Sequence, residues 1–543
     1  MKYTIGQFNV KSKDLKANYE EIKRLAIQAR QANYEMIVFG EYALTGYACG
    51  QLFLQADFYA EVDYYTNLLK DLSKDIIIVF GSVRMLDDKF YVTTTIAYNQ
   101  TILYSDKENL SKLEFVEDQI FTAGKNQMHT INQQVINFTF KDDYQASDFY
   151  TVILDSSPIN QSLPIIEPAG LYANTLGISH VAKVVYINGG SSFIQADQVY
   201  AFEHPLTAGI IESANELINV SKLDALVYGL RNFSLENFGP NKKWILGNSG
   251  GLDSAVTLSL MTIAFGQENV ISYNLRSQYN SDKTVNNAAN LAKALGVEHK
   301  AHSIDKTVST YIDTLADFDY HEIPTLALEN IQARTRGHLL GGFSSLEDAI
   351  ISNNGNKLEI MLGYATLYGD TIGALSIIGD LLKIEVFELA KEINAYFKKE
   401  VVPNNLLPKV ANYQVSFDMA PSAELKSDQK DPMKWYYHDY LVDLILNESV
   451  EAILELYLRD QFANIEIGKW LDFYDLKVGQ NFIDDFNWFL RTFEINNFKR
   501  MQMPPVLAFS NNVINRDYID SALVNPKSNA RLALEKAIIE KYQ

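Results

Sequence analysis

Apolar residues in the first 86 positions follow two alternating patterns. Short runs of β-type residues are separated by segments in which apolar residues recur every three to four positions. Alternating runs are typical of strands and the longer spacing of amphipathic helices. The pattern predicts strand, helix, strand, helix, strand, as one α/β layer, at residues 3–10, 18–32, 35–47, 58–73 and 76–86.

From residue 90 to about residue 200, short β-type runs dominate, and at 209–235 the pattern becomes helical without a Gly/Ser-rich or Pro-rich linker. We therefore place a domain boundary near residue 215, within about ten residues. The two predicted domains are residues 1–215 and 216–543. Two large domains also agree with the length of the chain.

The second half begins with another strand and helix alternation. Strands are predicted at 243–248, 269–275 and 299–304, and helices at 255–266 and 284–296. This order predicts a parallel, doubly wound sheet. Beyond about residue 435 the sequence is mostly helical and rich in aromatic residues, and we find no internal repeat.

The charge is strongly negative, at −20, from 47 Lys and Arg against 67 Asp and Glu. This excludes a broad basic surface for nucleic acid or an anionic membrane. The N-terminal residues do not resemble a signal peptide, and no run of about 18 apolar residues follows. The single cysteine, Cys49, cannot form an internal disulfide, which fits a reducing compartment. We expect a cytoplasmic protein.

Residues 249–254, SGGLDS, lie between a predicted strand and a predicted helix. Adjacent glycines at such a turn let backbone N–H groups face one concavity, which the N-terminus of the helix makes favourable for phosphate. The loop lacks the lysine of a Walker A motif. Asp253 beside phosphates requires a cation such as Mg²⁺. The alternative is a plain Gly-Gly turn with Asp253 as a helix N-cap.

SGGLDS resembles the loop of the PP-loop ATP pyrophosphatases. Four further segments, in the same order, resemble the NAD synthetase family: ENIQARTRG at 329–337, GNKLE at 355–359, GYATLYGD at 363–370 and PSAELKSDQKD at 421–431. The similarity spans about residues 223–505. The resemblance implies a PP-loop fold, with ATP as co-substrate and Mg²⁺ as cofactor.

The resemblance also implies roles for individual residues. The ATP-binding residues would be Ser249, Gly250, Gly251, Ser254 and Arg336. Asp253 and Glu359 would share Mg²⁺, and the catalytic residues would be Asp253, Asp370 and Lys383. The residues that contact deamido-NAD would be Asn330, Arg334, Asn354, Glu424, Asp428 and Lys430. Asn354 stands where relatives usually carry Thr, so we expect altered contacts there. For the arginines, the alternative is a solvated helix face.

The N-terminal third resembles the nitrilase-type glutaminase that is fused to many NAD synthetases, with an αββα sandwich fold. VFGEYALTGY at 38–47 carries the similarity. In that family a Glu, a Lys and a Cys hydrolyse glutamine. The resemblance gives Glu41 as the base, Lys107 as the group that stabilises the oxyanion and Glu117 as an auxiliary acid.

The nucleophile of that domain is missing. YTVILDSSP at 150–158 places Leu154 or Asp155 at the position of the thiol. Cys49 lies eight residues after Glu41 and is expected to be a half-buried apolar residue. Ser156 and Ser157 lie near the lost position, but a serine without its own base is a poor substitute for a thiolate. We therefore regard Glu41, Lys107 and Glu117 as a vestigial glutaminase site.

These features together predict an ammonia-dependent NAD synthetase with a degenerate glutaminase-like domain. The reaction would convert deamido-NAD, ATP and ammonia to NAD, AMP and pyrophosphate through an adenylated intermediate. Two alternatives stay open: glutamine hydrolysis by an unconventional nucleophile, and an inactive nucleotide-binding scaffold. We expect a homo-oligomer and no nucleic acid or membrane partner.

Overall fold

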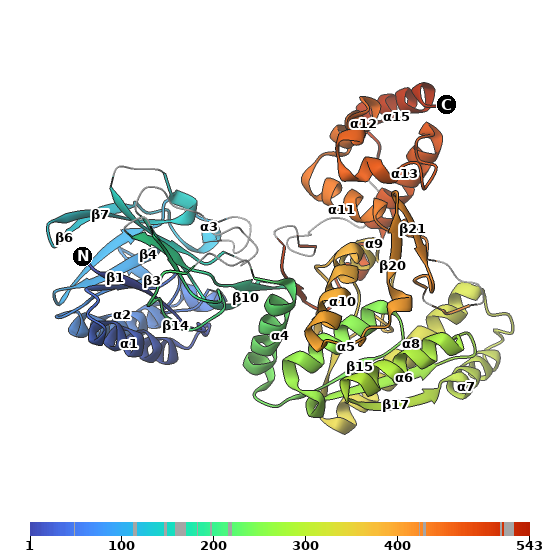
Figure 1. Cartoon of the computed structure of the whole chain (residues 1–543), viewed down its shortest axis with the longest axis horizontal. Coiled ribbons are helices and arrows are strands. Elements are labelled where there is room, and N and C mark those ends of the chain that lie inside the picture. The colour runs from blue at the N-terminus through green and yellow to red at the C-terminus, as the bar shows by residue number, and fades with distance from the viewer. Residues whose placement is uncertain are drawn as a thin grey trace. The chain divides into compact units, whose positions relative to one another are not determined.

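The computed structural model (Figure 1) describes residues 1–47, 49–111, 117–145, 149–157, 170–181, 183–195, 198–215, 220–422, 424–426, 431–510, 513–514 and 526–543. It separates into two compact units, residues 1–233 with 509–511 and residues 234–508 with 512–543. Within the described ranges, every helix is too short or too polar to cross a lipid bilayer.

The first unit contains two six-stranded sheets. Its first sheet is ordered β14 (Gly209–Ile210), β1 (Tyr3–Gln7), β2 (Met36–Val38), β3 (Ile77–Leu86), β4 (Lys89–Tyr98), β5 (Thr101–Asp106). Strands β1 to β3 are parallel, and the outer pairs are antiparallel. Helices α1 (Leu15–Gln31) and α2 (Ala56–Leu72) connect the parallel strands and pack on this sheet.

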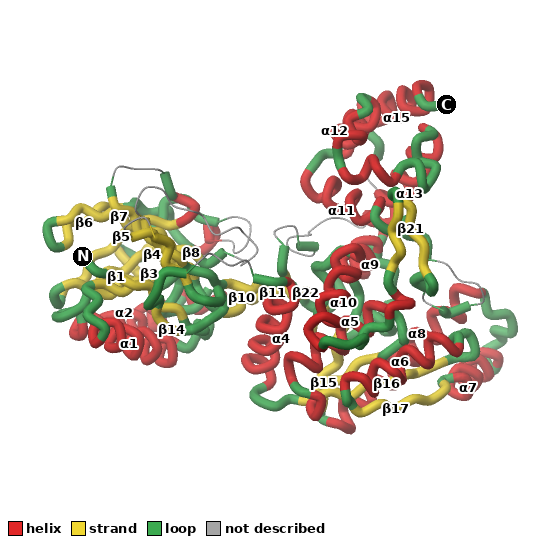
Figure 2. The backbone as a smooth tube through the Cα atoms, viewed as in Figure 1, coloured by secondary structure: helices red, strands yellow, loops and turns green. Residues whose placement is uncertain are grey.

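The second sheet is ordered β13 (Gln198–Ala201), β12 (Ser192–Gln195), β9 (Gly170–Asn174), β8 (Tyr150–Asp155), β7 (Gln134–Phe140), β6 (Gln127–Ile131). Strands β7, β8 and β9 are parallel. The unit also contains a hairpin of β10 (Gly177–Val181) and β11 (Val184–Asn188), and the short helix α3 (Glu117–Ile120). Figure 2 distinguishes the strands and helices by colour.

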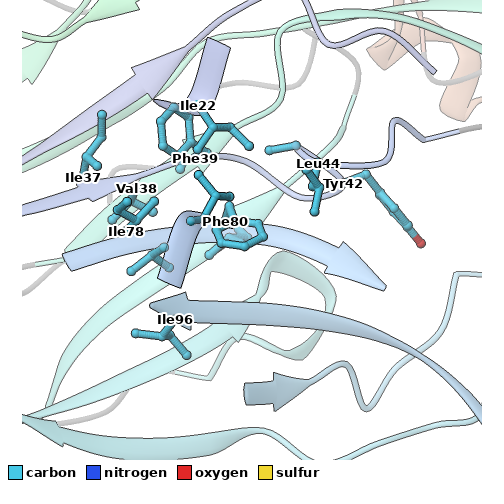
Figure 3. Close-up of a cluster of buried hydrophobic side chains, with 14 of the residues drawn as sticks. Ile22, Ile37, Val38, Phe39, Tyr42, Leu44, Ile78, Phe80 and Ile96 are labelled. Atoms are coloured by element: carbon cyan, nitrogen blue, oxygen red, sulfur yellow. The ribbon is translucent and has the colours of Figure 1, made fainter. Parts of the chain in front are cut away.

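The two sheets share one hydrophobic core. The first sheet contributes Ile37, Ile78, Phe80 and Ile96, all fully buried (Figure 3). The second sheet contributes Phe138, Phe140, Val152, Leu154 and Leu171. Helix α1 adds Ile22 and Leu25. Each such side chain contributes roughly 1.5–3 kcal/mol of burial free energy, so this core fixes the ends of the strands that carry the polar residues of the unit.

The prediction of a helix from residue 209 was wrong at its start. Gly209–Ile210 forms β14, which pairs antiparallel with β1, and helix α4 runs from Lys222 to Phe238. The Ser221 hydroxyl accepts a hydrogen bond from the Asp224 backbone N–H at 3.0 Å, which is an N-cap contact. The edge of the sheet therefore takes the residues that helical periodicity alone assigned to the helix.

The second unit contains a parallel sheet. The strands lie in the order β17 (Glu298–Ser303), β16 (Val270–Arg276), β15 (Lys243–Gly247), β18 (Ala349–Asn353), β19 (Leu375–Ser376), β22 (Val506–Ala508). The chain proceeds outward from β15 in one direction and then from β18 in the other. The predicted doubly wound sheet is confirmed, and its order reverses between β15 and β18.

Helices of the second unit connect these strands and continue beyond them. The helices of the sheet region are α5 (Leu252–Phe265), α6 (Asp282–Leu295), α7 (Asp305–Ala316), α8 (Thr325–Glu347), α9 (Lys357–Leu362) and α10 (Lys383–Phe397). A hairpin follows, β20 (Pro408–Ala411) and β21 (Gln414–Phe417). The predicted helical C-terminal part consists of α11 (Tyr437–Asn447), α12 (Val450–Leu458), α13 (Gly479–Ile495), α14 (Asn497–Arg500) and α15 (Asn529–Lys541).

Candidate active sites

The first candidate site lies at the strand-order reversal of the second unit. In open α/β sheets, ligands bind at the carboxyl ends of the strands where the order reverses. Strand β15 ends at Gly247 and its neighbour β18 ends at Asn353. The loop before α5 and the segment before α9 therefore leave the same edge of the sheet side by side.

The loop after β15 presents two hydroxyls and a helix N-terminus. The Oγ atoms of Ser249 and Ser254 are 3.1 Å apart, and Ser254 donates to the carbonyl of Gly251 at 3.0 Å. Gly251 is the N-cap residue of α5, and its N–H donates to Ser249 Oγ at 3.2 Å. A helix N-terminus with adjacent hydroxyls favours an anion such as phosphate.

Gly250 holds this loop against α6. Its φ is +82°, and a Cβ atom built there would lie 2.0 Å from the backbone carbonyl oxygen of Thr284. Both the backbone angle and this close approach require glycine. The first glycine of the motif therefore sets the path of the loop, in addition to any contact with a ligand.

Asp253 meets the side chains of two other segments. Its carboxylate forms an ion pair with Lys383, the first residue of α10, and accepts from Asn356 Nδ2 at 3.3 Å. Asn356 also closes a capping box with Glu359 at the start of α9. The Lys383 backbone N–H donates to the buried carboxylate of Asp439 at 2.7 Å. Three helix N-termini thus converge around the predicted metal ligands.

Lys383 lies among several carboxylates. Burial acts to lower its pKa, but the charges of Asp253, Glu359 and Asp431 outweigh it and raise the pKa. The pKa of Glu359 is raised to about 8, first by burial and then by the charge of Asp253. Tyr364 donates its hydroxyl to Asp431 at 3.2 Å. The carboxyl groups of Asp253, Glu359 and Asp431 outnumber the single ammonium group, and a cation bound beside them would favour the ionised form of Glu359.

This group of carboxyl side chains fits Mg²⁺. Within the described ranges, no group of three or more His, Cys, Asp and Glu side chains is arranged to hold a metal by itself. Mg²⁺ commonly uses one or two carboxylates and takes its other ligands from substrate phosphates and water. Asp253 and Glu359 beside a loop suited to phosphate provide such a donor set.

The predicted helix of nucleotide contacts is α8. Asn330 accepts from the Thr366 hydroxyl at 2.8 Å, and the exposed Arg334 donates Nε–H to the Leu367 carbonyl at 3.2 Å. Gly337 and Gly369 allow the close packing, since a Cβ at Gly337 would lie 2.7 Å from the Gly369 carbonyl oxygen. The segment 366–369 therefore packs directly on α8, which brings two of the sequence motifs together.

Arg336 has different surroundings. Its Nε–H donates to the Leu275 carbonyl at the end of β16 at 2.8 Å, and Nη2 donates to Asn280 Oδ1 at 3.4 Å. Burial lowers its pKa to about 10. Asn280 and Thr284 in turn donate to Glu424 at 3.0 and 2.8 Å. This chain of contacts connects Arg336, the first turn of α6 and Glu424 of the motif at 421–431.

The remaining predicted residues divide into three groups. Asn354 donates to the Gly247 carbonyl at 3.1 Å, so the atypical amide connects the ends of β18 and β15. Asp370 accepts from the Thr366 backbone N–H at 2.6 Å and its charge acts on Arg336. Within the described residues, Asp370 forms no hydrogen bond or ion pair with Lys383. Asp428 and Lys430 lie outside the described residues.

The second candidate site lies in the first unit, around the buried Lys107. Its ammonium group is 3.0 Å from Glu41 Oε1, 3.1 Å from Glu117 Oε2 and 3.0 Å from Asp142 Oδ2. Tyr42 donates its hydroxyl to Glu117 at 2.5 Å. The three residues predicted from the glutaminase resemblance are therefore in direct contact, with Asp142 as an additional carboxylate.

A serine hydroxyl contacts this cluster at the end of β8. Ser156 donates Oγ–H to Glu41 Oε2 at 2.8 Å. Leu154 is fully buried in the core, and Asp155 accepts from the Ser157 hydroxyl at 2.7 Å and from Tyr172. Among Leu154, Asp155 and Ser156, it is therefore Ser156 whose side chain contacts the predicted base.

Cys49 is buried. Within the described residues, it has no hydrogen bond to Glu41, Lys107 or Ser156. Its Sγ donates to the Thr45 carbonyl at 3.1 Å. Burial raises the pKa of the thiol to about 11, so the thiolate is scarce at neutral pH. Cys49 is therefore a small apolar residue as expected, but it is fully buried rather than half-buried.

Sequence reasoning missed Asp142, Asp431 and Asp439, and it considered Ser156 but judged it a poor substitute for the thiol. Asp431 is the last acid of the motif at 421–431, so the motif carried a signal that our residue choice did not use. Ser156 continues the alternation of Val152 and Leu154, which face the core in β8, and that alternation was a usable signal. Nothing in the sequence near Asp142 or Asp439 indicated their contacts.

Comparisons with known proteins agree with this geometry. Residues 224–467 match the family described as NAD synthase, and residues 2–142 match carbon-nitrogen hydrolase. The chain is 27% identical over 507 residues to the glutamine-dependent NAD(+) synthetase of Acinetobacter baylyi, covering 86% of this chain and 89% of that protein. A solved glutamine-dependent NAD(+) synthetase from Cytophaga hutchinsonii shares the fold, with TM-score 0.75, 16% identity and 99% of each chain covered.

A shorter relative has a higher identity over a smaller part of the chain. The NH(3)-dependent NAD(+) synthetase of Wolinella succinogenes is 36% identical over 217 residues, covering 39% of this chain and 74% of that protein. The matched hydrolase segment contains Glu41, Lys107 and Glu117, and the matched synthase segment contains Asp253, Glu359 and Lys383. The chain therefore belongs to the NAD synthase family, with a carbon-nitrogen hydrolase domain preceding its synthase domain.

Proposed function

We propose that this protein is an ATP-dependent NAD synthetase that takes free ammonia as its nitrogen donor. The reaction converts deamido-NAD, ATP and ammonia to NAD, AMP and pyrophosphate. The observation that carries the proposal is the convergence of Asp253, Glu359 and Lys383 on a phosphate-suited loop at the strand-order reversal. Family membership supports the same reaction.

The chemistry follows from the groups present. The nicotinate carboxylate attacks the α-phosphorus of ATP, and pyrophosphate leaves; ammonia then attacks the adenylated carboxyl carbon, and AMP leaves. Ser249, Ser254 and the N-terminus of α5 bind the phosphates. Lys383 places its ammonium group where negative charge develops on the reacting oxygens. Binding both nucleotides in one crevice makes the first step effectively intramolecular.

Mg²⁺ bound by Asp253 and Glu359 would neutralise charge on the pyrophosphate leaving group. The protein also positions these carboxylates itself. Asn356 donates to Asp253 of α5 and forms the capping box with Glu359 of α9, so one side chain connects both predicted metal ligands. Asp439 fixes the start of α10 and hence Lys383. These positioning contacts do not depend on the ion.

Two enzyme assays test the proposal. Purified protein with deamido-NAD, ATP, Mg²⁺ and an ammonium salt should yield NAD, AMP and pyrophosphate in equal amounts; ADP and phosphate instead would contradict it. Asp253→Asn keeps the size of the side chain but removes its charge, and should lower turnover by about a hundredfold or more. Asp282→Asn, in the exposed first turn of α6, is the matched control and should stay within about threefold of the unmodified protein.

The N-terminal unit supports ammonia as the donor. Glutamine hydrolysis by a thiol requires a cysteine beside Glu41, and the one cysteine in the sequence, Cys49, instead donates to a backbone carbonyl. Ser156 takes that place. A hydroxyl is a much weaker acid than a thiol, so amide hydrolysis fast enough to supply the synthetase is not expected.

A further inference from the structure

The Ser156 hydroxyl has a geometry that the synthetase reaction does not use. It lies immediately after β8 and donates to Glu41 Oε2 at 2.8 Å, while Glu41 Oε1 is 3.0 Å from Lys107 Nζ. All three side chains are buried. A nucleophile-type hydroxyl, a carboxylate base and a fixed cation within hydrogen-bond reach are the elements of a covalent acyl-transfer site.

We propose that Ser156 is a nucleophile and that the N-terminal unit hydrolyses small carboxylic esters. Glu41 acts as the general base, and Lys107 stabilises the oxyanion. This activity is separate from NAD synthesis and does not supply its nitrogen. It requires no group beyond the side chains of the cluster and water.

The reaction balances on these residues. Ser156 Oγ attacks the ester carbonyl carbon and its proton passes to Glu41; the carbon–oxygen bond to the alcohol breaks, and the alcohol leaves with that proton. Water then attacks the acyl-serine, giving one proton to Glu41, which returns it to Ser156 Oγ as the carboxylic acid leaves. The net change is ester plus water to acid plus alcohol.

Two features of the cluster favour esters over primary amides. Lys107 is shared by Glu41, Glu117 and Asp142, so only part of its charge serves an oxyanion. The Ser157 backbone N–H, the next donor along the chain, is held by Asp155 Oδ1 at 3.0 Å. Weak oxyanion stabilisation suffices for an ester, whose carbonyl is more electrophilic and whose alcohol leaves more readily than ammonia.

The surroundings also limit the size of the substrate. Glu41 and Lys107 are 3–4% exposed, whereas the Asp142 side chain is 50% exposed. The cluster therefore reaches solvent on the side of Asp142, and the acyl group that enters beside Ser156 must be short.

The test uses the full chain and p-nitrophenyl acetate. Mixing should release p-nitrophenol in a burst that approaches one equivalent per chain, and peptide mass spectrometry should find the acetyl group on Ser156. Ser156→Ala should remove the burst and lower steady hydrolysis at least about a hundredfold. Glu41→Gln should have a similar effect, since it removes the base.

Ser157→Ala is the matched control: the neighbouring hydroxyl contacts Asp155 and Lys141 rather than Glu41, so its burst should stay within about threefold. A far-UV circular dichroism spectrum and a thermal unfolding profile of Ser156→Ala that match those of the unmodified chain establish that this variant is folded. Acetylation of any other residue, an undiminished burst in Ser156→Ala, or no acetylation of the unmodified chain would each refute the proposal. None of these outcomes bears on the synthetase reaction.

Discussion

At the scale of single residues, Arg334 and Arg336 lie only two positions apart on α8 but have different surroundings. Successive positions on a helix differ by about 100°, so residues two apart point to different sides. Arg334 is exposed and contacts the Leu367 carbonyl, whereas Arg336 is partly buried and contacts Leu275 and Asn280. The guanidinium of Arg336 has a fork that a lysine lacks.

We predict that Arg336→Lys weakens nucleotide binding. The charge is kept, but the contacts that connect β16 to Asn280 and Glu424 are lost. Charge-assisted hydrogen bonds contribute about 1.5–3 kcal/mol, so the KM for ATP or deamido-NAD should rise about tenfold or more. Steady-state kinetics measures this. Unchanged KM values for both nucleotides would assign Arg336 to a purely structural role.

A pH profile tests the protonation of Glu41. Its pKa is raised to about 8, first by burial, although Lys107 acts to lower it. The groups that act on it electrostatically are Lys107, Glu117, Asp142 and Asp155. Since the carboxylate form is the base, the rate of Ser156 acetylation should rise with pH through about 8 and level off above it. A rate that is flat from pH 6 to 9 would contradict the role of Glu41.

At the scale of elements, the backbone path of the loop between β15 and α5 requires a glycine at position 250 more strictly than at position 251. Gly250 has φ of +82° and would place a Cβ 2.0 Å from the Thr284 carbonyl oxygen. Gly251 has φ of −86°, and its Cβ would have the Ser249 hydroxyl at 3.3 Å as its nearest neighbour. The two glycines are adjacent in sequence, so they form a matched pair.

We predict that Gly250→Ala lowers the thermal unfolding temperature of the second unit more than Gly251→Ala does. A strained positive φ costs of order 1–3 kcal/mol, and the clash with α6 adds to it, whereas Gly251→Ala should cost about 1 kcal/mol or less. Differential scanning calorimetry of both variants gives the comparison. Equal shifts would mean that the approach of the loop to Thr284 is unimportant.

At the scale of the whole molecule, the two units carry separate chemistry in this proposal. NAD formation supported by ammonium should exceed that supported by ammonium-free glutamine at least about a hundredfold. Ser156→Ala should leave the ammonium-supported rate unchanged. Rates should be measured by NAD production with each donor over a range of concentrations. Efficient use of glutamine that disappears in Ser156→Ala would instead make the N-terminal unit a serine-based glutaminase.

The sequence by itself determined the classes of structure and the loops that carry chemistry. Periodicity predicted the doubly wound sheet, and the motif SGGLDS located the turn between β15 and α5. These features are local: the period of apolar residues reports which face of an element is buried, and adjacent glycines report backbone angles. The resemblance also selected Glu41, Lys107 and Glu117, which the structure brings into contact.

Only the tertiary structure decided which side chains meet. Asp253 follows β15 and Glu359 follows β18, and they lie close together because these two strands are neighbours where the strand order reverses. The periodicity of apolar residues carries no information on that order. Likewise, the resemblance pointed to residues 154 and 155, but Leu154 packs in the core, and Ser156, on the same face just beyond the end of β8, contacts Glu41. Hydrogen bonds and ion pairs act over a few ångströms, so the packing of distant segments, rather than their spacing in sequence, determines these contacts.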